Sequence, residues 1–277
     1  MPPSEAAASI PATARVYRYD AGTIGPVLTR EIAVETPIEI AFGGAPFAVM
    51  MATPCDIEDF AIGFALTEGI IEAVEDIRSI EAAIDATSGR VNVTLSGERM
   101  GSHLARKRAM SGRTGCGLCG IEDLEHLPKA RRRLTPSRPI APEAIGAAVA
   151  GLASVQPLNA RTHTVHAAAW CGCDGAIRVA REDVGRHNAL DKLIGALLRE
   201  KAEPDEGFVL VSSRCSFEMV AKTAAFGAAT LVSVSAPTSL ALRRADECGL
   251  ALIAIARSDQ ALGFPGAAVP RSQGVAA

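Results

Sequence analysis

Apolar residues in the second half of the chain follow two alternating patterns. Short apolar runs are separated by longer segments whose apolar positions fall three or four residues apart, the spacing of one helix face. The runs predict strands over residues 164–170, 177–180, 208–211, 230–234 and 250–255, and the longer segments predict helices over 143–153, 186–200, 216–226 and 237–247. Strands alternating with helices imply an α/β domain with a mostly parallel sheet covered on both faces.

The first half has a different pattern, because polar and apolar residues alternate over much of Val16–Ala52. Asp56 then precedes a helical pattern and is expected to cap a helix that ends before Gly69. Residues 77–84 and 90–95 read as two strands of a hairpin. We therefore expect a smaller, β-rich α+β portion ahead of the α/β domain.

These patterns divide the chain into four parts. Residues 1–14 are rich in Ala, Pro and Ser and are expected to be disordered. Residues 15–110 form the β-rich portion and 140–277 the α/β core. Residues 111–139 are too long for an ordinary connection and are expected to form a mobile basic loop that carries two cysteines.

Composition limits the cellular setting and the class of protein. The 277 residues are 48% hydrophobic and 21% charged, as in a globular protein with a real core. The N-terminus lacks the pattern of a signal peptide, and no apolar run is long enough to span a membrane. Seven cysteines, an odd number, favour free thiols over a disulfide framework. We expect a cytoplasmic protein.

The stretch Gly115–Gly120 contains the most distinctive chemistry, with Cys116 and Cys119 separated by Gly-Leu and flanked by glycines. Glycine allows a loop to approach a partner closely, and the nearby Arg113 would favour a thiolate. Cys116 is therefore a candidate sulfur carrier, with Cys119 as its neighbour. The same spacing also fits half of a structural zinc site, completed by Cys171 and Cys173, a redox dithiol, or two ordinary thiols.

The net charge of −3 hides a basic segment around this motif. Residues 99–138 contain ten lysines or arginines and three acidic residues. Such a segment is either a solvated loop or a surface that attracts an anionic ligand or an acidic partner. Nucleic acid is a poor match, because aromatic residues make up 4% of the chain and do not alternate with the basic ones.

In a parallel sheet, ligands bind beyond the carboxyl ends of the strands. Three segments are predicted there: residues 212–215, 235–238 and 257–260. Ser213 and Ser235 fit either plain helix caps or ligand contacts, and Arg214 beside a helix start would suit a phosphate.

Residues 181–192 form a second polar cluster, at a predicted strand-to-helix junction. A histidine near a helix start, here His187, is usually a structural hydrogen-bonding residue, although the density of charge raises the odds of a site. His166 is expected to be buried and hydrogen-bonded on a strand. Cys55 is expected to be a small buried residue at a helix entry.

Several stretches together resemble the formate dehydrogenase accessory sulfurtransferase family (FdhD). The eleven residues Glu182–Lys192 are the most specific of them, and the Gly115–Gly120 motif is another. The other matching stretches are Thr53–Asp56, Glu58–Phe64, His166–Ala169, Ser216–Val220 with Lys222, and Ser235–Ala241. They follow the family's order from about residue 30 to 260.

The resemblance implies a function and a fold. Members take sulfur from a cysteine desulfurase as a cysteine persulfide and deliver it to the molybdenum bis(molybdopterin guanine dinucleotide) cofactor, a bound substrate that formate dehydrogenase then receives. No metal of the protein's own is implied. Cys116 and Cys119 would be catalytic. The cofactor-contacting segment would be Ile255, Ala256, Arg257, Ser258, Asp259 and Gln260. The implied fold is a cytidine-deaminase-like domain, as a homodimer.

Two other functions compete with the one that this resemblance implies. An active zinc deaminase needs a His-x-Glu or Cys-x-Glu pair, which the sequence lacks. A non-catalytic carrier or chaperone of the molybdenum cofactor, with the Cys-x-x-Cys pair incidental or zinc-binding, stays open because it would use the same groove.

Overall fold

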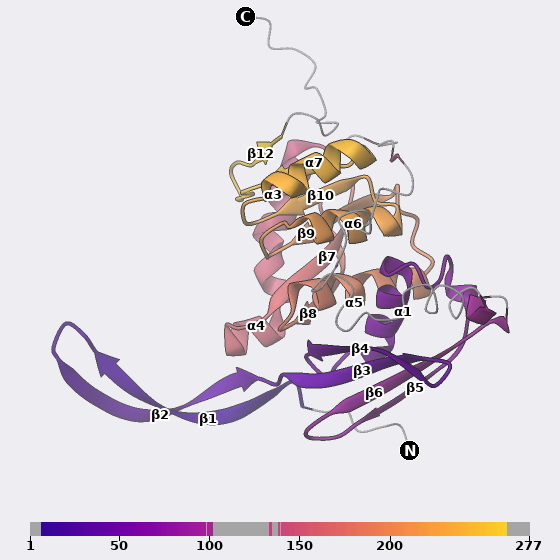
Figure 1. The fold of residues 1–277 in the computed structure, drawn as a ribbon. Helices are drawn as coiled ribbons and strands as arrows, with labels where there is room; N and C mark the ends of the chain where they lie inside the picture. The colour runs from indigo at the N-terminus through magenta and orange to yellow at the C-terminus, as the bar shows by residue number, and fades with distance from the viewer. Residues whose placement is uncertain (1–6, 98, 102–132, 135–137, 139, 265–277) are drawn as a thin grey trace, which may run out of the picture.

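The computed structural model describes residues 7–97, 99–101, 133–134, 138 and 140–264. In this part of the chain the strands form three sheets: a six-stranded sheet, a four-stranded sheet and a two-stranded ribbon that extends away from the body (Figure 1). The mixed α/β architecture agrees with the predicted class. The cytidine-deaminase-like topology and the division into four parts remain predictions.

The six-stranded sheet has the order β12-β11-β10-β9-β7-β8. Its strands are β7 (His166–Gly172), β8 (Ile177–Asp183), β9 (Gly207–Val211), β10 (Thr230–Ser233), β11 (Ala251–Ala254) and β12 (Leu262–Gly263). Only β9–β10 and β10–β11 pair in parallel, whereas β7–β8, β7–β9 and β11–β12 pair antiparallel. The expectation of a mostly parallel sheet is therefore wrong.

The connections between the strands explain the mixed directions. Repeated strand–helix–strand units join β9, β10 and β11, through α6 (Phe217–Phe226) and α7 (Ser239–Cys248). Such crossovers give parallel neighbours. A tight turn joins β7 to β8 instead, and Gly175 in that turn has a φ of 83°. The two strands were predicted, but the effect of the tight turn between them on the direction of the sheet was not.

Helices cover both faces of this sheet, as predicted. On one face, α3 (Pro142–Gly151) places Ala144, Ile145 and Ala148 in a core cluster with Phe208 and Leu210. On the other face lie α6, α7 and α5 (Arg186–Arg199). Further short helices in the described residues include η1 (Val74–Asp76), η3 (Leu152–Val155) and α4 (Pro157–Thr162). Among the described residues, no helix combines the length and apolarity of a membrane span.

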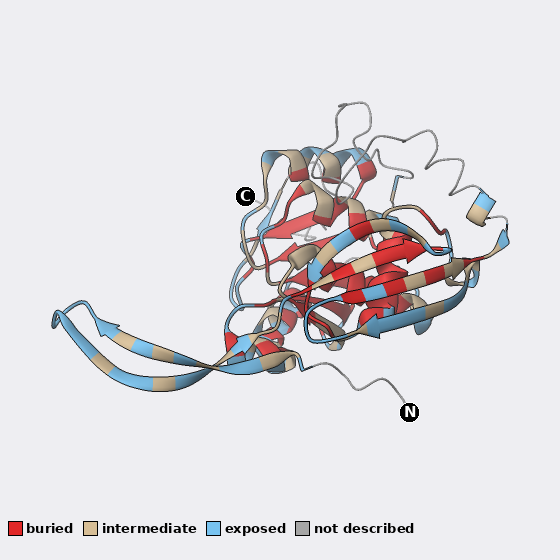
Figure 2. Ribbon diagram, turned by 60° about the horizontal axis from the view of Figure 1, so that its bottom comes forward, coloured by how far each residue is buried: buried red, intermediate tan, exposed pale blue. Residues whose placement is uncertain are grey.

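The four-stranded sheet has the order β4-β3-β6-β5. Its strands are β3 (Thr36–Phe42), β4 (Ala45–Ala52), β5 (Ile77–Ile84) and β6 (Gly89–Leu95). The predicted hairpin of β5 and β6 is confirmed. Ile38, Ile40 and Phe42 on the inner face of β3 belong to the same buried cluster as residues of α5, β9 and α6. The two portions of the chain therefore share one core (Figure 2).

The ribbon consists of β1 (Ser9–Arg18) and β2 (Thr23–Ala33), paired antiparallel. Residues 9–14 belong to β1, so the expectation of disorder over 1–14 is wrong for them. Their composition is rich in Ala and Pro, but their exposed and partly buried positions alternate in part, as in a paired strand. Ile10, Tyr17 and Ile24 are exposed, and Figure 2 shows the ribbon as largely unburied.

One helix crossing joins the β-rich portion to the α/β core. Helix α1 (Ile57–Thr67) packs on α5 with glycines at the contact. A Cβ on Gly63 would lie 1.8 Å from the carbonyl oxygen of Asp191, and a Cβ on Gly195 would lie 1.8 Å from that of Asp59. The two backbones therefore meet where no larger side chain fits.

The start of α1 differs from expectation. Asp56 has a left-handed φ of 51° and makes no capping hydrogen bond with its side chain. Its carboxylate instead lies 3.6 Å from Nε of Arg181 on β8. The predicted helix is confirmed, but the proposed capping role of Asp56 is wrong, because Asp56 faces the other portion of the molecule.

The glycine contact predicts a large effect from a single methyl group. Gly195→Ala should lower the free energy of unfolding by more than about 2 kcal/mol, because overpacking exceeds the gain in helix propensity. Gly97→Ala is the matched control, since a Cβ there meets no atom within 4 Å. Urea unfolding of the two variants measures the difference. Equal stabilities would contradict the close crossing.

Candidate functional site

Cys116 and Cys119 lie outside the described residues, and so does Arg113. Their catalytic role stays a prediction. The described chain on either side is anchored to the body. Nε of Arg99 donates to Asp76 at 3.0 Å, and the backbone N–H of Leu134 donates to the carbonyl of Cys248 at 2.7 Å.

The three segments predicted at the carboxyl edge of the sheet do meet there. They leave β9, β10 and β11, which run in parallel. The hydroxyl of Ser233 donates to the carbonyl of Ser213 at 2.8 Å, and the N–H of Ile255 donates to the carbonyl of Ser235 at 3.1 Å. These hydrogen bonds hold the loops together as one surface. Open α/β sheets bind ligands at this position.

The helices that follow two of these loops begin later than expected. The capping positions are Ser216 for α6 and Thr238 for α7, and Thr238 accepts the N–H of Ala241. Ser213 and Ser235 are therefore not helix caps. Arg214 is exposed on the loop after β9, as a phosphate contact requires, although nothing described assigns it that role.

A pocket of about 540 Å³ opens beside the loop after β11. That volume falls within the ~300–1,000 Å³ typical of small-ligand sites. Its lining includes Arg257, Ser258, Asp259 and Gln260 from the loop. Gly146 on the facing helix α3 allows the close approach, because a Cβ there would lie 2.9 Å from the carbonyl oxygen of Ser258.

The six residues predicted to contact a cofactor are thus distributed unevenly. Four line the pocket, whereas Ala256 is fully buried in the core and Ile255 is exposed. Ile255 has a φ of 52°, a rare conformation for a β-branched residue. Nη1 of Arg257 donates to the carbonyls of Val234 and Ala256, which fixes the guanidinium at the pocket. Their contact with a ligand stays a prediction.

A second polar group lies at the same edge, where α5 and α6 begin. Nε2 of His187 lies 3.0 Å from Oε2 of Glu218, and the hydroxyl of Ser216 donates to the same oxygen at 2.8 Å. The close contact with the ring of His187 is the main cause that lowers the pKa of Glu218 to about 2. Burial, followed by the charge of Arg186, lowers the pKa of His166 nearby.

His166 and His187 were treated as structural on the sequence alone. His166 is only half-buried, at the start of β7, rather than buried as expected. Sequence reasoning missed the pairing of His187 with Glu218, because thirty residues separate them along the chain. The useful signal was that both residues lie in the first turn of a predicted helix.

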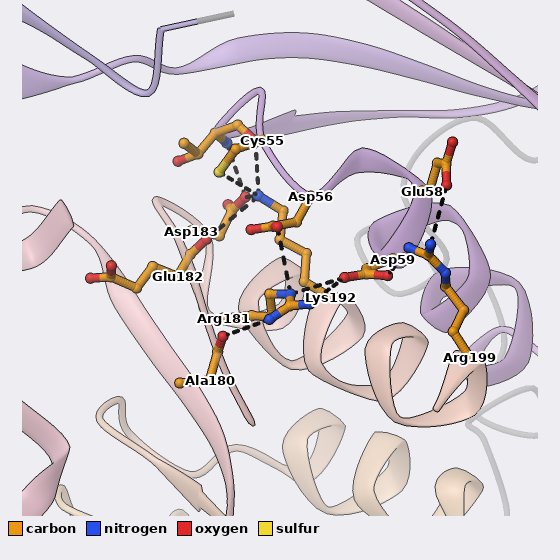
Figure 3. A network of polar contacts seen from close by, with 11 residues as sticks. Cys55, Asp56, Glu58, Asp59, Ala180, Arg181, Glu182, Asp183, Lys192 and Arg199 are labelled. Atoms are coloured by element: carbon orange, nitrogen blue, oxygen red, sulfur yellow. Dashed lines mark hydrogen bonds and ion pairs between the residues drawn. The ribbon is translucent and has the colours of Figure 1, made fainter. Parts of the chain in front are cut away.

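The specific stretch Glu182–Lys192 has a structural role in large part (Figure 3). Nζ of Lys192 lies 2.7 Å from Asp183 and donates to the carbonyl of Thr53 at 2.9 Å. Asp183 also accepts the backbone N–H of Thr53 at 2.9 Å. Lys192 and Asp183 are both fully buried, so this ion pair joins the end of β4 to α5 out of reach of solvent.

Further ion pairs and hydrogen bonds connect α1, α5, α6 and β8. Asp59 is buried and accepts two hydrogen bonds from Arg181 and one from Arg199 (Figure 3). Lys222 on α6 lies 2.8 Å from Asp191, which also accepts the hydroxyl of Thr67. Together these contacts explain most of the charge in the cluster that the sequence analysis identified.

Four of the five described cysteines are poor candidates for thiolate chemistry. Burial raises the pKa of Cys55 to about 11 and that of Cys171 and Cys215 to about 12. Burial also raises the pKa of Cys248. Cys55 is half-buried, and its sulfur lies 3.8 Å from Nζ of Lys192. These thiols stay protonated at neutral pH.

The possible zinc site gains no support from the described residues. They contain no group of three or more His, Cys, Asp or Glu side chains placed to hold a metal. Cys171 is fully buried on β7, and Cys173 donates to the carbonyl of Glu206. The other two proposed ligands, Cys116 and Cys119, are not described.

Comparisons with known proteins give a consistent result. A family model described as the FdhD/NarQ family matches residues 33–267. The chain is 44% identical over 254 residues to a protein from Bordetella petrii named sulfur carrier protein FdhD, covering 90% of each. It is 45% identical over 228 residues to a protein of the same name from Variovorax paradoxus, covering 82% of each.

The fold also resembles a solved structure. A crystal structure from Desulfotalea psychrophila, of a chain described as a formate dehydrogenase accessory protein, superposes with a TM-score of 0.70 at 28% identity. The match covers 93% of this chain and 97% of the other.

The buried Lys192–Asp183 pair predicts a severe loss from removing one charge. Lys192→Met should lower the free energy of unfolding by about 3 kcal/mol or more, because Asp183 is left buried without its partner. The matched control is Arg178→Met, which removes the exposed pair of Arg178 with Asp174 and should cost less than about 1 kcal/mol. Chemical denaturation measures both. Equal losses would contradict the structural role of the buried pair.

The lowered pKa of Glu218 predicts a pH-dependent contribution to stability. A carboxylate whose folded pKa is about 2, against an ordinary 4.5, stabilises the fold above pH 4.5 and loses that contribution as the pH falls toward 2. Glu218→Gln should therefore be less stable than the parent protein at pH 7, and the gap should narrow below pH 4.5. Thermal unfolding across this range tests it, and a constant gap would contradict the assignment.

Proposed function

Because the chain belongs to the FdhD/NarQ family, we propose that it is a sulfur carrier in the maturation of formate dehydrogenase. The relatives named above supply the coarse function. The finer steps below combine that membership with the chemistry of this chain's own residues.

The proposed carrier is Cys116, which accepts sulfur from a cysteine desulfurase and holds it as a persulfide. An acceptor attacks the outer sulfur of the persulfide, the sulfur–sulfur bond breaks, and its electron pair stays on the sulfur of Cys116 as a thiolate. The acceptor is the molybdenum bis(molybdopterin guanine dinucleotide) cofactor, a substrate of this protein. Cys119 is the neighbouring thiol of the motif. The protein acts as a sulfurtransferase.

The observation that supports this assignment is the state of the other thiols. Four of the five described cysteines are held protonated by burial, which leaves them unsuited to nucleophilic attack. The other three cysteines are Cys173, which donates to the carbonyl of Glu206, and Cys116 and Cys119, which belong to a glycine-flanked segment with basic neighbours. Of these three, the pair with basic neighbours is the best candidate for thiolate chemistry.

The pocket beside the loop after β11 is the proposed contact for one end of the cofactor. Its volume suits a drug-sized ligand, so it would take a part of a bis-dinucleotide rather than the whole. Arg257 supplies a fixed guanidinium that suits phosphate, while Glu143 and Asp259 place carboxylates on the same lining. Hydrogen-bond acceptors of this kind suit the amino and ring N–H groups of a guanine base.

The proposed partners are a cysteine desulfurase, formate dehydrogenase and a second copy of this chain as a homodimer. The alternative function is a non-catalytic carrier or chaperone of the molybdenum cofactor. In that case the pocket would still bind its ligand, but no sulfur would be held covalently. The two functions therefore differ in a single measurable adduct.

Mass spectrometry after incubation with a cysteine desulfurase and cysteine measures that adduct. The parent protein should gain about 32 Da per sulfur atom, the mark of a persulfide. Cys116→Ala should lose the adduct completely. Cys173→Ser is the matched control, because it removes the one described cysteine that burial does not exclude, and it should keep the adduct.

An adduct of equal size in Cys116→Ala would reject Cys116 as the carrier. If the parent protein gains no mass but still binds the molybdenum cofactor, the chaperone function replaces the proposed one. Cys119→Ala, measured in parallel, separates a carrier role from a supporting role for the second thiol.

A further inference from the structure

One face of the β1–β2 ribbon is apolar. In an antiparallel pair, directly opposed residues share a face, and every second residue of a strand lies on the same face. The register therefore gathers six apolar residues on one face: Ile10, Ala12, Ala14 and Val16 from β1, and Leu28 and Ile32 from β2. On the other face Thr13 opposes Thr29, and Pro11 opposes Glu31. This alternation is typical of a ribbon that packs on another surface by one face.

The described chain leaves this apolar face open to solvent in part. Figures 1 and 2 both show the ribbon extending away from the body. Strand β2 contacts α4, yet Ile10 and Ile32 remain 47% and 42% exposed. A two-stranded ribbon by itself is at best marginally stable in water. A second surface that covered this face would therefore stabilise the ribbon as well as bind it.

The same chain offers a second uncovered apolar surface, on β4. Val49 and Met51 are 59% and 47% exposed. They oppose Glu39 and Pro37 of β3, so all four lie on the outer face of the four-stranded sheet, where we name them the β4 patch. Among the described residues, eight of the ten large exposed hydrophobic side chains belong to β4 or to the ribbon with its turn. These are therefore the two main apolar surfaces of the described chain.

The two surfaces carry opposite charges. Arg30 opposes Ala12, so its side chain lies on the apolar face of the ribbon, where it is exposed. Glu39 belongs to the β4 patch, and its side chain is 33% exposed beside Arg90, 2.8 Å away. Exposed Glu81 lies on the same outer face of the sheet. A carboxylate accepts several hydrogen bonds at once, so Glu39 can receive a second guanidinium in addition to that of Arg90.

The size of the ribbon suits a reciprocal contact. A strand of ten residues is about 34 Å long, and two strands side by side are about 10 Å wide. One face of the ribbon therefore presents about 300 Å². Two such contacts, counted on both copies, would bury about 1,300 Å², within the range of about 1,200–2,000 Å² for specific, stable interfaces. A single ribbon contact would fall below that range.

We propose that each ribbon packs its apolar face on the β4 patch of a second copy of this chain, in a reciprocal two-fold dimer. Both complementary surfaces belong to one chain, so a two-fold axis satisfies both at once and closes the assembly at two copies. A second copy is among the partners of the proposed function, and this inference assigns the surface by which it binds. It rests on that homodimer and not on the chemistry of sulfur transfer.

Sedimentation equilibrium of the full chain measures the association. The parent protein should have about twice the 28.7 kDa of one chain. Ile10→Glu with Ile32→Lys places a charged pair on the apolar face and should weaken the dimer at least about 100-fold, because these charges would be buried against the β4 patch. The matched control is Thr13→Glu with Thr29→Lys, which places the same opposed pair on the other face and should change the dissociation constant less than about threefold.

A photoreactive side chain locates the partner surface without disturbing the charge of the ribbon. Benzoylphenylalanine in place of Ala14, on the apolar face, should cross-link to a peptide that contains Val49 or Met51. In a mixture of unlabelled and isotope-labelled chains, some of these cross-links should join a light chain to a heavy chain, because they form between copies. The same side chain in place of Thr13, on the other face, should give no such cross-link.

The contrary outcomes each overturn a stated part of the proposal. If the parent protein sediments as a monomer up to about 100 μM, a second copy does not cover the ribbon. Loss of persulfide formation in the Ile10 and Ile32 double variant would then assign the apolar face to the cysteine desulfurase. A parent dimer that both double variants preserve would keep the homodimer and overturn the role of the ribbon. Cross-links from ribbon to ribbon would reject the β4 patch as the contact. The adduct on Cys116 tests the sulfur-carrier function independently of these results.

Discussion

The contact between α1 and α5 is the constraint on which the rest of the structure depends. Gly63 and Gly195 allow the two backbones to meet, and a methyl group on either would overlap a carbonyl of the other helix. Ion pairs surround this contact. Buried Asp59 forms ion pairs with Arg181 and Arg199, and Asp183 forms one with Lys192. Removing one partner leaves the other charge buried and unpaired, which lowers the stability of the fold. The pairs therefore favour one arrangement of the two portions.

This arrangement also fixes the polar residues at the start of α5. Helix α5 packs on α1 along its length, and its first turn carries Arg186 and His187. A shift of α5 at the glycine contact would move His187 relative to Glu218 on α6. The β-rich portion therefore contributes to the geometry of the carboxyl edge, where the hydroxyl of Thr53 also accepts the N–H of Val184. Residues far from a site can in this way determine its geometry.

The sequence predicted the elements better than their directions. Periodicity located α1, α5, α6 and the hairpin of β5 and β6, because each has a one-sided apolar pattern of ordinary length. It did not reveal that β7 runs antiparallel to both of its neighbours, β8 and β9, since strand direction depends on pairing between distant segments. Residues 9–14 were misjudged for a similar reason, because their strand depends on pairing with β2.

The candidate site shows the same limit. The loops after β9, β10 and β11 were expected at one edge from the strand–helix alternation, and they meet there. The stretch Glu182–Lys192 was identified correctly from its density of charge. The pattern did not show which of its residues are structural and which are accessible. Asp183 and Lys192 turn inward to a buried pair, whereas His187 turns to Glu218 at the surface. The sequence pattern alone cannot distinguish a buried ion pair from an accessible one.

The exposed edges and faces of the β1–β2 ribbon affect which contacts it can make with other proteins. Within the described residues it has no third strand, so each strand presents an edge to which a foreign strand could add. Pro11 on β1 and Pro26 on β2 each remove an amide donor, which interrupts any continuous ladder formed by such an addition. Ile10, Tyr17 and Ile24 remain exposed. The ribbon therefore offers its faces for contact with another protein, whereas its prolines disfavour the addition of a strand at its edges.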